Sequence, residues 1–194
     1  MHPNLIRTHM LDIHTFYFNP YRECTYIVVN NHDAIVIDPG MYTDREQERF
    51  VHYIREHQLQ IAAILITHSH PDHICGLEMV QQLAPQAPVI GINYQMSKEI
   101  DKPMTIAGIP FRILPTPGHK EDSVCYYIEP EKTIFTGDTL FQSSIGRTDL
   151  PGGDWDTLMR SLQQLKQLPD DTIVYPGHGE TTTIGEEKMQ NPYL

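Results

Sequence analysis

Short apolar runs separated by turn-forming residues alternate along the chain with segments of helical periodicity. Runs rich in β-branched and aromatic residues predict strands at residues 11–18, 25–29, 34–37, 62–66, 89–92, 111–114, 124–128, 133–136 and 173–175. Apolar positions three or four residues apart predict helices at residues 43–57, 74–83 and 154–165. The first helix begins with a capping box from Thr43 to Glu46, and the last has Asp154 as its N-cap. Many strands mixed with few helices predict α/β layers packed around one core.

The composition narrows the class of protein. With 194 residues and 40% hydrophobic residues, the chain suits a single domain over residues 1–194, with residues 1–10 as a loose leader. No apolar stretch approaches the ~18 residues of a membrane span, and the first residues lack the basic flank and apolar run of a signal peptide, so we expect a cytoplasmic protein without a membrane partner. The net charge of −11 argues against a nucleic-acid partner. Three widely spaced cysteines predict reduced thiols instead of disulfides.

Five of the predicted strands run directly into a short loop that carries histidine or aspartate. Loops that follow rigid strands can hold polar groups at one edge of a sheet. A single loop of this kind is ordinary solvated chain, whereas five loops with metal-ligand side chains predict a shared site. The side chains concerned are Asp38, the run from His68 to His73, His119, Asp138 and His178.

The segment His68-Ser69-His70-Pro71-Asp72-His73 carries the strongest local signal. Side chains two residues apart in an extended segment share a side, so His68, His70 and Asp72 are expected to face one centre. His73 follows where the chain turns into the next helix and is expected to face a neighbouring centre. Imidazole and carboxylate ligands without thiolate suit zinc, iron or manganese, and a ligand set that leaves coordination positions open is typical of a catalytic metal site.

These motifs, in this order along nearly the whole chain, resemble the metallo-β-lactamase superfamily. The resemblance implies a four-layer αββα sandwich with two divalent metal ions at one edge of its sheets, zinc being expected and iron or manganese the alternatives. It also implies a ligand set: His68, His70 and His119 for the first ion, Asp72, His73 and His178 for the second, and Asp138 as a bridge. Asp38 corresponds to the family's buried aspartate, which lies behind the ligands and binds no metal.

Within the superfamily, residues 136–141, 144–154 and 177–188 resemble the short bacterial proteins of the glyoxalase II (hydroxyacylglutathione hydrolase) type. Aspartate at position 138, where the true β-lactamases usually have cysteine, favours this thioesterase-like branch. The resemblance implies a small-molecule thioester substrate such as S-lactoylglutathione. It places Arg147 where a lysine contacts the glutathione carboxylate, and a structural salt bridge is the alternative role for this arginine. The chain is expected to lack the C-terminal helical domain of full-length glyoxalase II.

The expected reaction is hydrolysis by water. Two divalent ions about 3.5–4 Å apart can share one hydroxide and lower the pKa of its parent water to about 7. We expect this hydroxide to attack the thioester carbonyl, with Asp72 holding or deprotonating the nucleophile. The chain has no G-x-S-x-G motif for a serine nucleophile, which agrees with this route.

Three other functions stay open at this point. The first is a persulfide dioxygenase, which would use one iron bound on the His68 side together with His119 and Asp138. The second is a lactonase or another ester hydrolase. The third is a non-catalytic metal-binding module, which the complete ligand set disfavours because a binding scaffold needs no open coordination positions.

Overall fold

The first part of the chain forms a five-stranded mixed sheet in the order β1-β2-β3-β4-β5. The structure is a computed structural model that describes residues 11–91, 93 and 103–194. The strands are β1 (Asp12–Phe18), β2 (Glu23–Asn30), β3 (Asp33–Ile37), β4 (Gln60–Leu65) and β5 (Val89–Ile90). The first three pair antiparallel, whereas β3, β4 and β5 run parallel. The parallel part brings the carboxyl ends of β3 and β4 to the same edge of the sheet.

The second part forms a six-stranded sheet in the order β13-β12-β9-β8-β7-β6. Its strands are β6 (Met104–Ile106), β7 (Ile109–Pro115), β8 (Val124–Ile128), β9 (Thr133–Gly137), β12 (Ile173–Pro176) and β13 (Thr182–Thr183). Strands β9 and β12 are parallel, and the other pairs are antiparallel. A separate two-stranded hairpin, β10 (Leu140–Phe141) and β11 (Ser144–Ile145), follows β9.

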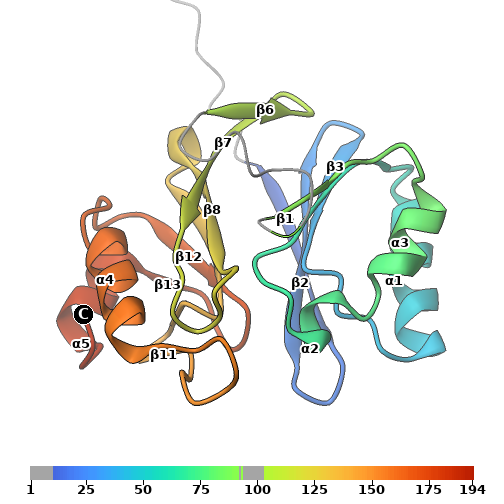
Figure 1. The fold of residues 1–194 in the computed structure, drawn as a ribbon. Coiled ribbons are helices and arrows are strands. Elements are labelled where there is room, and N and C mark those ends of the chain that lie inside the picture. Colours follow the sequence, from blue (N-terminus) through green and yellow to red (C-terminus); the bar gives the residue numbers. More distant parts are fainter. Residues whose placement is uncertain (1–10, 92, 94–102) are drawn as a thin grey trace, which may run out of the picture.

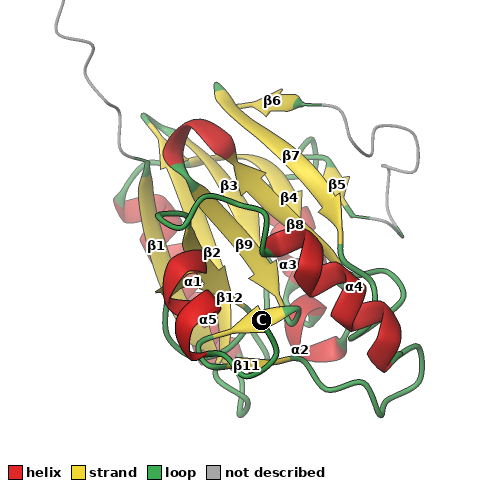
Figure 2. Cartoon of the chain, turned by 90° about the vertical axis from the view of Figure 1, so that its left-hand side faces the viewer, coloured by secondary structure: helices red, strands yellow, loops and turns green. Residues whose placement is uncertain are grey.

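Helices cover the outer faces of both sheets (Figures 1 and 2). The α-helices are α1 (Asp44–Glu56), α2 (Pro71–Ile74), α3 (Leu77–Leu83), α4 (Trp155–Leu165) and α5 (Ile184–Gln190), and a 3-10 turn, η1, spans Glu129–Glu131. One apolar cluster joins α1 and α3 to the first sheet, a second lies between the two sheets, and a third joins α4 and α5 to the second sheet. Three buried interfaces between four layers confirm the predicted αββα sandwich. None of the helices among the described residues is both long and apolar enough to cross a membrane.

Most of the predicted elements are present with shifted ends. The predicted helix over residues 74–83 is divided into α2 and α3 because the N–H of Gly76 donates to the carbonyl of Pro39 (2.8 Å), outside the helix. The predicted strand over residues 89–92 is observed as Val89–Ile90, and residue 92, like the predicted leader over residues 1–10, lies outside the described residues. The prediction missed β6, β10, β11, β13 and α5.

Candidate metal centre

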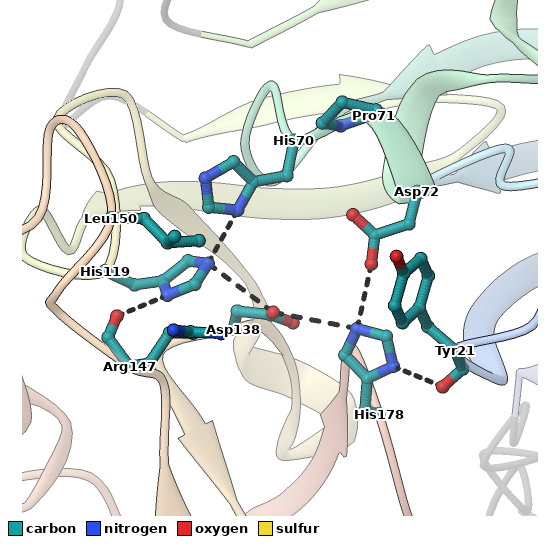
Figure 3. Close-up of a pocket in the computed structure, with 9 residues that line it drawn as sticks. All are labelled: Tyr21, His70, Pro71, Asp72, His119, Asp138, Arg147, Leu150 and His178. Carbon is teal, nitrogen blue, oxygen red and sulfur yellow. Dashed lines mark hydrogen bonds and ion pairs between the residues drawn. The ribbon is translucent and has the colours of Figure 1, made fainter.

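The loops after five strands meet at one edge of the two sheets, near the α2 and β11 labels of Figure 1. The loops after β3 and β4 come from the first sheet, and those after β7, β9 and β12 come from the second. The loops after β4, β7, β9 and β12 each contribute to the lining of a cleft of about 480 Å³. Figure 3 shows the residues that line it: Tyr21, His70, Pro71, Asp72, His119, Asp138, Arg147, Leu150 and His178.

Three imidazoles form the first group of close side chains. One ring nitrogen each from His68, His70 and His119 lies within 4.8 Å of the others. The Nδ1 atom of His70 is 3.1 Å from Nε2 of His68 and 2.8 Å from Nε2 of His119. Burial lowers the pKa of His68 well below its usual value, which favours a neutral ring with a free lone pair. Three converging nitrogens of this kind suit a metal cation.

Asp72, His73 and His178 form a second group, whose ligand atoms also lie within 4.8 Å of one another. Oδ2 of Asp72 is 3.3 Å from Nε2 of His178 and 3.8 Å from Nε2 of His73. The alternation of side chains in an extended segment predicted that Asp72 shares a centre with His68 and His70, whereas the family resemblance grouped it with His73 and His178. The structure brings Asp72 to His73, because Pro71 begins α2 and turns the chain away from the extended conformation.

The carboxylate of Asp138 lies between the two groups. Its Oδ1 is 3.3 Å from Nε2 of His73, and its Oδ2 is 3.5 Å from Nε2 of His119 and 3.6 Å from Nε2 of His178. Burial by itself raises the pKa of Asp138, but the neighbouring histidines, His73 first, outweigh that effect and hold the pKa below its usual value. An ionised carboxylate at this position has one oxygen available for each group.

The second ring nitrogen of three of these histidines is held by an oxygen acceptor. Nδ1 of His73 lies 2.9 Å from Oδ2 of Asp38, Nδ1 of His119 lies 2.7 Å from the carbonyl of Arg147, and Nδ1 of His178 lies 3.1 Å from the carbonyl of Tyr21. Burial by itself lowers the pKa of His73, but the neighbouring carboxylates, Asp138 first, outweigh burial and raise this pKa, which favours a second proton on Nε2. Each acceptor requires the proton on Nδ1, so the tautomer that remains when Nε2 loses its proton directs the Nε2 lone pair into the site. This tautomer is the one that a metal ligand needs.

Asp38 is a buried carboxylate that forms, with His68 and His73, a third group whose possible ligand atoms lie within 4.8 Å of one another. It is buried, follows β3 and has a φ of 49°, a left-handed conformation that aspartate tolerates. The backbone N–H of Thr67 donates to its Oδ1 (2.7 Å), and the hydroxyl of Thr67 donates to its Oδ2. Its oxygens are therefore occupied by Thr67 and His73.

Glu23 is a buried carboxyl group that sequence reasoning missed. Its Oε1 lies 3.9 Å from Nδ1 of His73, and the hydroxyl of Thr25 donates to its Oε2 (2.9 Å). Burial raises the pKa of Glu23 well above its usual value, which favours the protonated form. In the sequence, Glu23 is one acidic residue at the start of a strand of mostly apolar residues. That position alone does not indicate that the carboxyl group is buried.

The fit of the site to metal ions is supported by its orphaned polar atoms. Nε2 of His73 and Oδ1 of Asp138 are buried and have no hydrogen-bond partner among the described residues. The two atoms lie 3.3 Å from each other as an ion pair without hydrogen-bond geometry, and a cation bound by both would satisfy them. The donor set of imidazole nitrogen and carboxylate oxygen suits a divalent transition-metal ion.

Arg147 lines the cleft, but its guanidinium group is already paired. Its Nε and one terminal nitrogen donate to the two carboxylate oxygens of Asp149 (2.7 and 2.6 Å), and both side chains are exposed. Its backbone carbonyl is the acceptor that orients His119. The sequence left two roles open for the guanidinium, a contact for a substrate anion or a structural salt bridge. It did not indicate the role of the carbonyl, since no sequence pattern marks a carbonyl that will orient a distant side chain.

Comparison with known proteins agrees with this geometry. A sequence model of the metallo-beta-lactamase superfamily matches residues 22–104 and 98–178. Hydroxyacylglutathione hydrolase GloC of Haemophilus influenzae is 35% identical over 203 residues, which cover 89% of this chain and 92% of that protein.

Solved structures superpose over nearly the whole chain. The B3 metallo-beta-lactamase BLEG-1 has a TM-score of 0.84 and 33% identity, covering 94% of this chain and 99% of its own. ETHE1 from Myxococcus xanthus has a TM-score of 0.80 and 29% identity, covering 93% and 83%. The protein TTHA1623, solved in a di-iron-bound form, has a TM-score of 0.78 and 30% identity, covering 93% and 100%.

Proposed function

The chain belongs to the metallo-beta-lactamase superfamily, and from that premise we propose that it is a thioester hydrolase of the glyoxalase II type that uses two divalent metal ions. The superfamily match supports a metal-dependent hydrolase in general. The observation that carries the finer proposal is the pair of three-residue groups with Asp138 between them. The likeness to the Haemophilus influenzae hydroxyacylglutathione hydrolase supports a thioester as the substrate.

Each group offers one set of ligands in this proposal. His68, His70 and His119 hold the first ion, Asp72, His73 and His178 hold the second, and Asp138 contributes one oxygen to each. Zinc is the expected metal, and iron is supported as an alternative by the di-iron form of TTHA1623; manganese also suits the donor set. When bound, the ions supply an activated water and polarise the substrate carbonyl.

The side chains of the protein position the remaining participants. Asp72 is 20% exposed and lines the cleft, so its carboxylate can hold a water molecule at the cleft floor and accept its proton. The Asp38 carboxylate and the carbonyls of Arg147 and Tyr21 keep the histidine rings in one orientation. A thiol leaving group has a pKa of ~8.5 and departs without a strong general acid, which agrees with a cleft that contains no lysine among its lining residues.

Arg147 is proposed to bind an anionic part of the substrate. Its partner Asp149 is 67% exposed, and an exposed ion pair contributes little net free energy. A substrate carboxylate can therefore replace Asp149 on the guanidinium at little cost.

The decisive experiment combines metal analysis with a thioester assay. We expect the purified protein to bind two divalent ions per chain and to hydrolyse S-lactoylglutathione, and we expect chelation to abolish turnover until zinc, iron or manganese is restored. Asp138→Ala should remove the activity, whereas Asp171→Ala, which changes an exposed carboxylate paired with Lys132, should leave it unchanged. A fully loaded protein with two ions and no thioesterase activity would refute the proposal.

A persulfide dioxygenase is the second candidate, and the likeness to ETHE1 favours it. This activity would need one iron, with the His73 and His178 nitrogens left without metal. Oxygen consumption with a glutathione persulfide, together with a stoichiometry of one iron per chain, would support the second candidate over the first.

A further inference from the structure

A second cavity of about 280 Å³, named here the side groove, adjoins the cleft over the proposed ligands. Tyr21, Pro71 and Asp72 line both cavities, so the two spaces are adjacent. The side groove is completed by Asn19, Pro20, Tyr42 and Cys75, and apolar atoms make up most of its walls. A ligand whose reacting group lies beside Asp72 can therefore extend into an apolar space.

The walls of the side groove are held together by hydrogen bonds of the side chain and the backbone of Asn19. The amide of Asn19 donates to the carbonyl of Gly40 (3.0 Å) and to the carbonyl of Asp72 (2.9 Å). The N–H of Tyr21 donates to Oδ1 of Asn19 (3.0 Å), and the N–H of Asn19 donates to the carboxylate of Glu46 at the start of α1 (2.7 Å). The β1–β2 turn, the start of α2 and the start of α1 are thus tied to one another. The groove is formed before any ligand binds, which lowers the entropic cost of occupying it.

The two ends of the cleft differ in chemistry. At one end lie Leu150 and Arg147, where the charged pair with Asp149 is exposed. At the other end the ring of Tyr21 stands beside Asp72 and His178 (Figure 3), and the apolar side groove follows. A thioester carbonyl placed between Asp72 and Asp138 has two substituents, and they leave it in different directions. The polar, charged thiol portion suits the Arg147 end, which leaves the acyl group for the Tyr21 end.

We propose that the side groove binds the acyl group of the thioester and that the enzyme prefers apolar acyl chains longer than the lactoyl group. This inference rests on the proposed thioesterase function and adds the substrate class. Tyr21 and Tyr42 are the specificity-determining residues, because their rings are exposed to solvent in the free protein, 73% and 68% respectively, and become covered by an acyl chain. Burial of each methylene group against such surfaces raises kcat/KM about threefold to fourfold.

The first test compares two thioesters of one thiol, S-acetyl- and S-hexanoyl-N-acetylcysteamine. We expect kcat/KM to be at least about tenfold higher for the hexanoyl ester. Tyr42→Ala, which removes one wall, and Cys75→Phe, which fills the groove, should each reduce that ratio about tenfold, mainly through KM. Tyr193→Ala is the matched control, because this partly exposed tyrosine lines neither cavity. Equal ratios in the wild type and both groove variants would overturn the proposal.

The second test does not depend on turnover. Cys75 is exposed in the groove, whereas Cys24 and Cys125 are buried, so the rate of iodoacetamide alkylation reports on Cys75. An inert analogue of the hexanoyl ester, with a methylene between sulfur and carbonyl, should slow alkylation at least about fivefold at saturation, since a covered thiol is not accessible to the reagent. The corresponding acetyl analogue should not slow it.

The two tests separate the inference from the function on which it rests. Protection of Cys75 by the hexanoyl analogue, in a protein that hydrolyses neither ester, would keep the groove assignment and refute the thioesterase. Hydrolysis of both esters without protection of Cys75 would keep the thioesterase and overturn the groove assignment.

Discussion

Asp38→Asn is the change that best tests how the proposed metal centre is held. The carboxylate of Asp38 accepts the backbone N–H of Thr67 on Oδ1, and on Oδ2 it meets the Thr67 hydroxyl and Nδ1 of His73. Asparagine has the same shape and also tolerates the left-handed φ of 49° at this position. The substitution therefore changes the hydrogen-bonding pattern without changing the packing.

The expected effect follows from the number of acceptors. The asparagine side chain has one carbonyl oxygen where aspartate has two acceptor oxygens, and the N–H of Thr67 requires that oxygen. The amide NH₂ then faces Nδ1 of His73, which must give up its proton, and the proton moves to Nε2. A ring protonated on Nε2 cannot bind a metal there. Loss of a partner behind a ligand typically weakens metal binding about 10–100-fold, or ~1.4–2.8 kcal/mol.

The measurement is a competition titration of the two ions against a chelator of known affinity. We expect the ion held by Asp72, His73 and His178 to bind about 10–100-fold more weakly, and the ion held by the other group to change far less. Asp33→Asn is the matched control, because Asp33 is an exposed aspartate at the start of the same strand, β3. Unchanged affinity for both ions in Asp38→Asn, with a normal thermal melt, would refute the assignment of Asp38 as the group that fixes the His73 tautomer.

Further predictions concern the bridge, the substrate anion and the thiols. Asp138→Ala should reduce kcat by several orders of magnitude and weaken both ions together, which elemental analysis after dialysis will show; turnover at the wild-type rate would remove Asp138 from the site. Arg147→Ala should raise KM for an anionic thioester about 10-fold with little change in kcat, whereas equal losses for a neutral thioester would make the residue structural. Burial raises the pKa of Cys24 and of Cys125 to about 12, so both thiols stay neutral at pH 8. Mass spectrometry should then find one alkylated cysteine, Cys75, in the native protein and three in urea, and rapid native labelling of Cys125 would contradict the described core.

The sequence predicted those parts of the structure that depend on local pattern. The capping box at Thr43 and the apolar positions that follow it specify α1, and the observed helix has both capping hydrogen bonds and a buried Phe50. The ligand-type side chains were found because each follows an apolar strand directly. The expectation from extended geometry that Asp72 faces the same centre as His68 was wrong, because the extended geometry ends at Pro71. The family resemblance had grouped Asp72 with His73 and His178, as the structure does.

Other features depend on contacts between distant residues and leave little trace in the sequence. Helix α5 has one buried apolar residue, Ile184, and its buried carboxylate, Glu187, accepts hydrogen bonds from Ser143 and Thr182. The sequence of α5 therefore lacks the row of apolar residues by which an amphipathic helix is usually predicted. The capping box at Thr183 was its one helix signal. The roles of the Tyr21 and Arg147 carbonyls were equally invisible, because every residue has a carbonyl.

The proposed ligands come from both sheets, and the ribosome makes the first sheet before the second. This order determines when a metal ion can be bound during synthesis. A nascent chain that has exposed only the first sheet presents the histidines of the His68–His73 segment, but no partner from β7, β9 or β12. Each of the two groups proposed to hold an ion is then incomplete, and in the third group, Asp38, His68 and His73, the Asp38 oxygens are already occupied by Thr67 and His73. An ion bound by two side chains exchanges readily with the pool around it. In the proposed arrangement, selective and tight loading begins only when His119 has folded into place and is complete only after His178 has joined, so each ion would join the earlier half of the chain to the later one.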